Sequence, residues 1–168
     1  FPYTTLFRSG LLEFALGGLD EDQIEKALAC VISPGIPMSR PWVKQLQDAG
    51  VPIISEIELA WECSAGRVAA ITGTNGKTTT TTLVGEIFKR AGRKTEIAGN
   101  IGRAVTGVAM DVDDDTWMIT ECSSFQLETI RDFRPRVSAL LNVTPDHLDR
   151  HGSMENYLAA KERVFENQ

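Results

Sequence analysis

Hydrophobic positions in the second half of the chain change from strand-like to helix-like spacing around one glycine-rich turn. Residues 68–72 ("VAAIT") form a short apolar run, which is typical of a buried strand. Apolar side chains then recur at helical spacing along residues 78–91, at Leu83, Val84, Ile87, Phe88 and Ala91. Gly92 follows as a helix stop. The pattern therefore predicts a strand, a tight loop and a helix, in that order.

The rest of the chain repeats this alternation. Short apolar runs predict strands at residues 29–33, 51–55, 95–99, 117–121 and 137–143. Helix-like patterns occupy residues 20–28, 41–50, 56–63 and about 153–166. Helices that alternate with apolar strands are typical of a parallel sheet. We therefore predict the α/β class, with a three-layer parallel sheet and helices on both of its faces.

Charge and cysteine content narrow the partners and the compartment. A net charge of -6 argues against a nucleic-acid or anionic-membrane surface. Cys30, Cys63 and Cys122 are far apart and form no disulfide framework, which favours a reduced, cytoplasmic compartment. No apolar run approaches the ~18 residues that a membrane span needs. We expect a cytoplasmic monomer without nucleic-acid or membrane partners.

The two ends of the chain predict a fragment of a longer protein. The segment "FPYTTLFRSG" has no clear periodicity and begins with Phe rather than Met. The last residues stop in or just after a predicted helix, with no closing strand. We assign no domain to residues 1–10, and we do not assume that they belong to the natural protein.

The turn itself, "GTNGKT", has the parts of a phosphate-binding loop in a shortened form. A P-loop reads G-x-x-x-x-G-K-[ST], but here only two residues separate Gly73 from Gly76. A strand, two glycines and a helix start would aim backbone N–H groups at an anion. Lys77 would meet the outer phosphates, and the Thr78 hydroxyl would bind Mg²⁺. A plain glycine turn would not need Lys-Thr after the second glycine, so we interpret the stretch as a phosphate cradle.

Two other predicted strands end in residues that suit a metal next to a phosphate. In open α/β sheets, ligands bind beyond the carboxyl ends of the strands. Glu121 ends the strand at residues 117–121, and Asp146 and His147 follow the strand at residues 137–143. The alternatives are a solvent-facing charge for Glu121 and a satisfied loop histidine for His147. His151 is expected to be merely exposed nearby.

Lys161 interrupts an apolar face of the last predicted helix. Met154, Leu158 and Phe165 share that face with it, at spacings of three to four residues, and Tyr157 and Val164 lie beside it. One interpretation is snorkelling, in which the stem packs and the ammonium stays in water. The other is a desolvated lysine whose pKa falls, so that the neutral amine becomes available for chemistry. The pattern alone leaves both open.

Several longer stretches resemble the Mur ligases of peptidoglycan synthesis. They are "VISPGIP", "GTNGKTTTTTLVGEIFKRAG", "GNIG", "ECSSFQLETI" and "LLNVTPDHLDRHGSMENYLAAKERVFENQ". The resemblance covers about residues 11–168. It implies that residues 11–66 are the C-terminal part of a Rossmann-like uridine-nucleotide domain. Residues 67–168 would be the N-terminal part of a P-loop-type central ATP-binding domain, with the rest of that domain and a C-terminal domain absent.

The resemblance also implies an activity. ATP would phosphorylate UDP-N-acetylmuramoyl-L-alanine to an acyl phosphate, and D-glutamate would displace phosphate to form an amide. Most of the D-glutamate site would lie in the absent C-terminal part. Such chemistry depends mainly on positioning and charge neutralisation. The fragment alone is expected to be inactive.

The resemblance implies roles for particular residues. ATP phosphates would be bound by Gly73, Thr74, Asn75, Gly76, Lys77, Thr78 and Thr79. Metal would be held by Thr78, Glu121, His147 and Lys161 as a carbamate, with Lys77, Glu121, His147 and Lys161 as the catalytic set. The sugar-nucleotide substrate would be contacted by Ser33, Pro34, Gly35, Asn100, Ser123 and Gln126. Cys122, where the family pattern usually has an aliphatic residue, is interpreted as a tolerated core substitution.

Three alternatives stay open. A sibling ligase would add a different amino acid, and folylpolyglutamate synthase would share part of the loop but looks like "GTNGKGS". Thr78 and the stretch "SSFQLE" argue against the synthase. A chain that binds ATP without catalysis is the alternative from another class.

Overall fold

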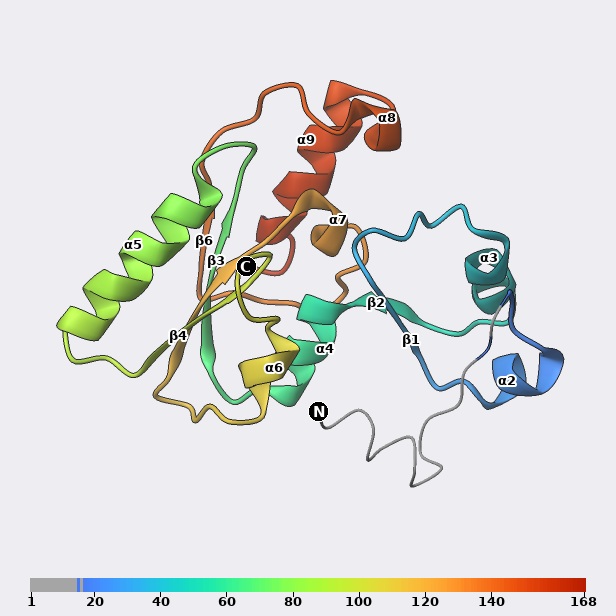
Figure 1. The fold of residues 1–168 in the computed structure, drawn as a ribbon, viewed down its shortest axis with the longest axis horizontal. Coiled ribbons are helices and arrows are strands. Elements are labelled where there is room, and N and C mark those ends of the chain that lie inside the picture. Colours follow the sequence, from blue (N-terminus) through green and yellow to red (C-terminus); the bar gives the residue numbers. More distant parts are fainter. Residues whose placement is uncertain (1–14, 16) are drawn as a thin grey trace. The chain divides into compact units, whose positions relative to one another are not determined.

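A computed structural model describes residue 15 and residues 17–168. The elements, labelled in Figure 1, are α2 (Glu21–Lys26), β1 (Cys30–Ile32), α3 (Pro41–Asp48), β2 (Ile53–Ser55), α4 (Glu56–Cys63), β3 (Arg67–Thr72), α5 (Lys77–Arg90), β4 (Thr95–Gly99), α6 (Thr106–Ala109), β5 (Trp117–Glu121), α7 (Ser124–Leu127), β6 (Val137–Leu140), α8 (Leu148–His151), α9 (Met154–Glu162) and the 3-10 helix η1 (Arg163–Phe165). The unassigned segment 1–10 lies outside the described residues.

The chain divides into two compact units. The smaller unit contains the described residues up to 30 together with Met38–Pro52, and the larger contains Val31–Pro37 together with Ile53–Gln168. In the smaller unit, Asp20 and Gln23 form a capping box that starts α2. Helix α3 starts at Pro41, where a missing N–H costs nothing, and its Val43 and Leu46 are buried. Both helices confirm the sequence prediction.

The larger unit is built on a four-stranded parallel sheet in the order β4-β5-β3-β6. The register pairs Ile71 with Glu121, Gly99 with Glu121, and Thr72 with Leu140. The carboxyl ends of all four strands therefore meet at one edge. The loops that follow these strands therefore start close to one another. Open α/β sheets bind ligands at this edge. Strands β1 and β2 form a separate two-stranded sheet.

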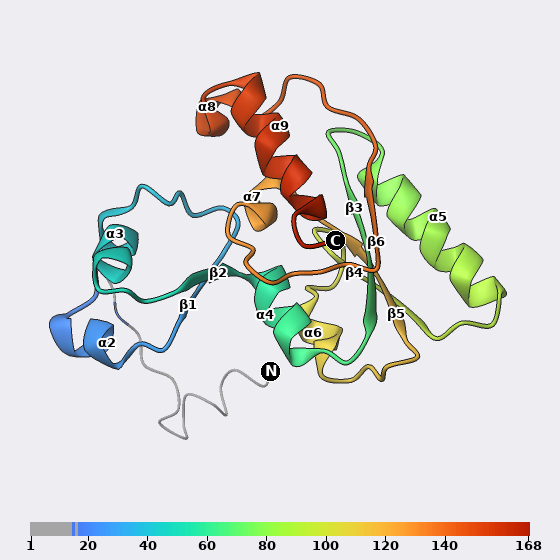
Figure 2. The ribbon, with the colours of Figure 1, turned by 180° about the vertical axis from the view of Figure 1, so that it is seen from behind.

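Helices cover both faces of the four-stranded sheet, with α5 on one side and α4 and α6 on the other (Figures 1 and 2). Strand β3 shows why. Its Val68 and Ala70 belong to the core cluster shared with α4 and α6, whereas Ala69 and Ile71 pack toward α5. A strand buried on both faces has no polar side, and this confirms the three-layer α/β prediction.

Helix α5 buries less of itself than its apolar pattern predicts. Val84 and Phe88 pack on the sheet, but Leu83 and Ile87 are 58% and 54% exposed. A helix that lies on one face of a sheet buries only one stripe. Gly85 lies on that stripe, and a Cβ there would lie 2.4 Å from Ile97 of β4, so glycine lets α5 approach the sheet closely.

The C-terminal region differs in detail from the prediction. The expected helix at about residues 153–166 is divided into α9 and η1, and the expected strand at residues 137–143 ends at Leu140. The one-turn helices α6, α7 and α8 were not predicted, because four residues give too little periodicity to detect. In the described part of the chain, no helix is both long and apolar enough to span a membrane.

Candidate functional site

The loop between β3 and α5 has the backbone shape that the glycine pattern predicts. Gly76 precedes α5 in the left-handed region at φ 79°, and Gly73 has φ 148°. A Cβ on Gly73 would lie 3.2 Å from the Leu141 side chain and 3.3 Å from the Asn142 carbonyl oxygen. Both positions therefore require glycine, and the first N–H groups of α5 have no intrahelical acceptor.

The segment after β6 holds this loop from the side. The Thr74 N–H donates to the Asn142 carbonyl at 2.9 Å, and the Asn75 N–H donates to the Asn142 side-chain oxygen at 2.9 Å. The Asn142 amide donates back to the Asn75 carbonyl at 3.0 Å. Asn142 thus fixes three consecutive peptide groups of the loop, a role that the sequence did not reveal.

Two of the predicted metal ligands are in direct contact at the carboxyl edge of the sheet. The Thr78 hydroxyl donates to one oxygen of Glu121 at 2.8 Å, and the Asn100 amide donates to the other at 3.0 Å. Glu121 is only 1% exposed, so the solvent-facing interpretation is wrong. A hydroxyl and a carboxylate beside a phosphate loop are the hard oxygen donors that suit Mg²⁺.

Gly99 sets the position of Glu121. It has φ 115°, and a Cβ there would lie 2.2 Å from the Glu121 carbonyl oxygen. The next N–H, that of Asn100, donates to the same carbonyl at 2.9 Å. Strand β4 therefore ends directly against the backbone of Glu121, which brings the Asn100 side chain to the carboxylate.

Two lysines from different helices, Lys77 of α5 and Lys161 of α9, contact the phosphate loop. Lys77 donates to the Thr74 carbonyl and Lys161 to the Gly73 carbonyl, each at 2.8 Å. The Lys161 ammonium also lies 4.6 Å from the centroid of the Tyr157 ring, and the Tyr157 hydroxyl is 3.1 Å from the Thr74 hydroxyl. Helix α9 therefore contacts the first two residues of the loop.

Lys161 is buried rather than snorkelling. Lys161 is only 2% exposed. Burial is the main cause that lowers its pKa to about 8, and the nearby positive charge of Lys77 adds to this effect. The expected apolar face is only partly buried: Leu158 and Phe165 are exposed, whereas Tyr157 and Val164, expected beside that face, are buried. The buried face of this region is formed by Tyr157, Ala160, Lys161 and Val164.

In the part of the chain that the structure describes, His147 forms no hydrogen bond or ion pair with the other predicted metal ligands, Thr78, Glu121 and Lys161. It precedes α8 with φ 50°, its side chain is about half exposed, and its ring lies 5.0 Å from that of Phe125. Its role as a metal ligand stays a prediction.

The expectation that His151 is merely exposed was wrong. It is 9% exposed, its Nε2 lies 3.0 Å from the Ser124 hydroxyl, and its Nδ1 lies 3.5 Å from a Glu128 oxygen. Burial lowers the pKa of His151 below its ordinary value. A one-turn helix offers no periodicity that would have indicated this burial. Cys122, in contrast, is buried in the core as predicted, and burial raises the pKa of its thiol.

Several predicted substrate residues line one pocket of the larger unit. Ser33, Pro34, Asn100 and Gln126 line a pocket of about 440 Å³, together with Gly99 and Glu56. Ser123 lies next to the pocket residue Gln126, because it is the N-cap of α7. Its hydroxyl accepts from the Gln126 N–H, and the Gln126 side chain accepts from the Ser123 backbone N–H, which completes a capping box. Neither Ser123 nor Gly35 is part of the pocket wall itself.

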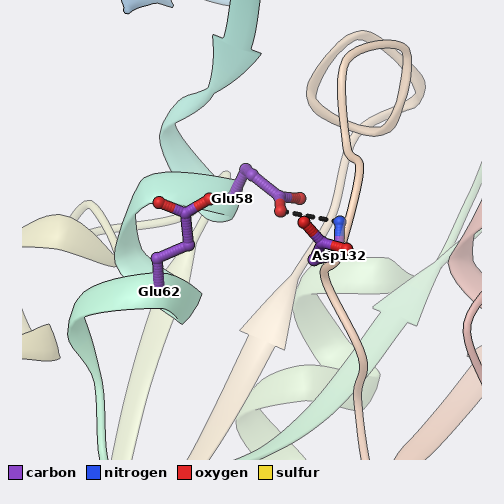
Figure 3. Close-up of side chains that lie close together, drawn as sticks. All are labelled: Glu58, Glu62 and Asp132. Atoms are coloured by element: carbon purple, nitrogen blue, oxygen red, sulfur yellow. Dashed lines mark hydrogen bonds between the residues drawn. The ribbon is translucent and has the colours of Figure 1, made fainter. Parts of the chain in front are cut away.

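A second group of carboxylates, shown in Figure 3, has a structural explanation. Glu58, Glu62 and Asp132 bring oxygens within 4.8 Å of one another. Glu58 is fully buried, and its oxygens accept the N–H groups of Arg131, Asp132 and Phe133 at 2.8 to 3.1 Å. The carboxylate thus satisfies the buried backbone of a loop.

The carboxyl ends of these parallel strands meet a glycine loop, a helix start and a Thr–Glu pair, and this arrangement is typical of α/β domains with a P-loop-type fold. Residues 71–168 match the family described as Mur ligase middle domain. The chain belongs to the Mur ligase family.

Curated relatives share this similarity over most of the chain. A UDP-N-acetylmuramoylalanine–D-glutamate ligase from Koribacter versatilis is 57% identical over 138 residues, which are 82% of this chain and 30% of that protein. A ligase of the same name from Lachnospira eligens is 50% identical over 156 residues, which are 93% of this chain and 35% of that protein. The chain therefore spans about a third of the length of these relatives.

Solved structures agree on the fold. UDP-N-acetylmuramate:L-alanyl-gamma-D-glutamyl-meso-diaminopimelate ligase from Neisseria meningitides aligns with a TM-score of 0.56 and 20% identity, over 98% of this chain and 56% of that one. MurF ligase from Thermotoga maritima, in complex with ADP, aligns with a TM-score of 0.50 and 18% identity, over 84% of this chain and 41% of that one. At these identities the likeness concerns the fold alone.

Proposed function

We propose that this chain forms the phosphate-binding part of an ATP-dependent ligase that joins D-glutamate to UDP-N-acetylmuramoyl-L-alanine. The observation that carries the proposal is the contact between Thr78 and Glu121 beside the phosphate loop. The names of the relatives that are 50–57% identical support the choice of substrates. The enzyme would act in the cytoplasm on a precursor of peptidoglycan.

The first chemical step is phosphoryl transfer. A carboxylate oxygen of the muramoyl-L-alanine attacks the γ-phosphorus of ATP, the bond to the β-phosphate oxygen breaks, and ADP leaves. The N–H groups at the start of α5 and the ammonium of Lys77 would bind the phosphates and offset their charge. Thr78 and Glu121 would hold Mg²⁺, which neutralises phosphate charge when bound.

The second step forms the amide. The neutral amine of D-glutamate attacks the acyl carbon, a proton is lost from nitrogen, and the tetrahedral intermediate expels inorganic phosphate. Asn100 and Gln126 would hold the muramoyl substrate from the wall of the 440 Å³ pocket. Their amides are neutral donors and acceptors, which suits the polar sugar and peptide groups of this substrate.

Lys161 would enter this chemistry as a carbamate. Its neutral amine attacks CO₂, forms an N–C bond and releases a proton, which turns a cation into an anion that can bind metal. Burial favours this reaction because it lowers the pKa of Lys161 to about 8. His147 would bind a second metal ion. The flanking residues 11–66 would be the end of a uridine-nucleotide domain, and residues 67–168 the start of the ATP-binding domain.

A titration of the chain with Mg-ATP tests the phosphate site. The unchanged chain and Lys89→Ala should bind saturably, whereas Lys77→Ala should lose at least about tenfold in affinity, as expected when a charged partner is removed. Lys89 is a suitable control because it lies on the same helix and pairs with Glu86 at the surface. Equal binding by all three chains would refute the phosphate-loop assignment.

A chimera tests the ligase. This chain would replace the matching third of the Koribacter versatilis relative, and phosphate release would be measured with and without D-glutamate. We expect release that requires D-glutamate and prefers UDP-N-acetylmuramoyl-L-alanine over UDP-N-acetylmuramate. Activity with UDP-N-acetylmuramate instead would favour a sibling ligase. ATP binding without any product would favour the non-catalytic alternative.

A further inference from the structure

Arg150, on α8, contacts two parts of the larger unit that contribute to the pocket, the segment around Pro34 and helix α7. One arm of its guanidinium donates to the Pro34 carbonyl at 2.9 Å, and the other donates to Glu128 at 2.7 Å. Its central carbon lies 4.3 Å from the centroid of the Phe125 ring. The side chain is only 16% exposed, so these contacts are made in a partly desolvated setting. A planar guanidinium suits this combination of a carboxylate, a carbonyl and a ring face.

The segment that Arg150 contacts forms one part of the pocket wall. Ser33 and Pro34 line the pocket, and the Ile36 N–H closes a turn onto the Ser33 carbonyl at 3.0 Å. Another part of the wall includes Gln126, which neighbours Phe125 on the one-turn helix α7. Arg150 therefore contacts the backbone of one part of the wall and the helix that supplies the other part.

We propose that Arg150 is a positioning residue that fixes the distance between these two parts of the wall and so sets the affinity for the sugar nucleotide. The inference rests on the proposed function, because it assumes that the pocket binds this substrate. Arg150 acts through Pro34 and α7, since its two terminal nitrogens donate to Pro34 and Glu128. The phosphate loop is held by other residues, Asn142, Tyr157 and Lys161, so ATP affinity should not depend on Arg150.

Arg150→Lys provides the test, because lysine keeps the charge but cannot bridge both partners or lie flat on Phe125. The matched control is Arg67→Lys, at the start of β3, where the arginine pairs with Asp115 at the surface. Calorimetric titration with UDP-N-acetylmuramoyl-L-alanine should show about tenfold weaker binding for Arg150→Lys, a change of about 1.4 kcal/mol. Binding of Mg-ATP should change by less than about twofold, and Arg67→Lys should match the unchanged chain with both ligands.

Hydrogen exchange separates this inference from the proposed function. The Ile36 amide should exchange faster in Arg150→Lys than in Arg67→Lys or in the unchanged chain, whether or not any ligand binds. A chain that fails to bind the sugar nucleotide would overturn the proposed function, and faster exchange at Ile36 would still support positioning by Arg150. Unchanged exchange, or equal losses of affinity for both ligands, would overturn the positioning role.

Discussion

Thr78 and Glu121 are 43 residues apart in the chain, and their side chains meet in a hydrogen bond of 2.8 Å. The contact exists because β3 and β5 are adjacent parallel strands that end in register, with Ile71 opposite Glu121. The helix that follows β3 therefore begins beside the last residue of β5. A hydroxyl from a helix start and a carboxylate from a strand end become one set of oxygen donors.

Removal of the Thr78 hydroxyl should weaken the binding of ATP only when magnesium is present. Thr78→Val keeps the shape of the side chain and removes the hydroxyl, so we expect a roughly tenfold to hundredfold loss in Mg-ATP affinity. Titrations with and without Mg²⁺ measure the difference. Thr82→Val is the control, because Thr82 is an exposed threonine one turn along the same helix. A loss of equal size without Mg²⁺ would argue for a direct role of the hydroxyl at the phosphates.

Lys161 should form a carbamate with dissolved CO₂. Its pKa of about 8 leaves about half of the amine neutral at pH 8. The chain equilibrated with ¹³C-labelled CO₂ at pH 8 should give a carbamate carbon signal by NMR that is absent from Lys161→Arg. The signal should fade at pH 6, where the ammonium form dominates. An identical signal from Lys161→Arg would assign the carbamate to another amine.

His151 should make the chain less stable as the pH falls. Burial lowers the pKa of His151 in the folded state, so the unfolded chain takes up a proton at a higher pH than the folded chain does. Its contribution to the free energy of unfolding is therefore present above about pH 6.5 and is lost as the pH falls through the folded-state pKa. Urea unfolding of the unchanged chain and of His151→Gln between pH 7 and pH 5 should show a steeper decline in the free energy of unfolding for the unchanged chain.

The exposed His147 provides the comparison for that experiment. His147→Gln should retain the pH dependence of the unchanged chain, because its side chain is about half exposed. The groups that face His151 are Glu128, Arg150, His147 and Lys161, and all but His147 remain in both variants. If His151→Gln and His147→Gln had the same pH dependence, burial of His151 would not be its source.

Gly99→Ala should be among the most damaging small substitutions in the larger unit. The added Cβ would lie 2.2 Å from the Glu121 carbonyl oxygen at a φ of 115°, so the end of β4 must move. We expect a loss of roughly 3 kcal/mol or more in the free energy of unfolding, measured with urea. Gly107→Ala, on α6 with nothing within 4 Å of the added atom, should be neutral or stabilising by up to roughly 1 kcal/mol. Similar losses of stability for both variants would show that the close contact between Gly99 and Glu121 is not the reason why residue 99 is glycine.

The sequence was most informative where local chemistry determines the structure. Glycines at the end of an apolar strand, followed by Lys77 and Thr78, predicted the loop, and the structure has it with both glycines in conformations that side chains rarely adopt. The end of the strand at Glu121 was also predicted, so the carboxyl edge of the sheet could be expected to bring Glu121 toward Thr78. Both predictions depend on short segments and on the general behaviour of parallel sheets.

Features that depend on contacts between distant segments of the chain were not predicted or were predicted wrongly. Asn142 hydrogen-bonds to Asn75, which lies 67 residues earlier, and no local sequence pattern indicates this contact. The burial of His151 depends on Ser124 and Glu128 from another helix. The apolar face of the last helix was expected to bury Leu158 and Phe165, but both are exposed. Tyr157 and Lys161, from the same predicted face and its border, are buried because they contact the phosphate loop.

The double hydrogen bond between Asn142 and Asn75 has a consequence for how a shortened loop can work. A loop that becomes ordered only when an anion binds loses conformational freedom at the moment of binding. Here the segment after β6 restrains the loop through Asn142 in the folded chain. The conformational entropy of this turn is therefore lost during folding, and a ligand that binds at the loop would not have to order these peptide groups.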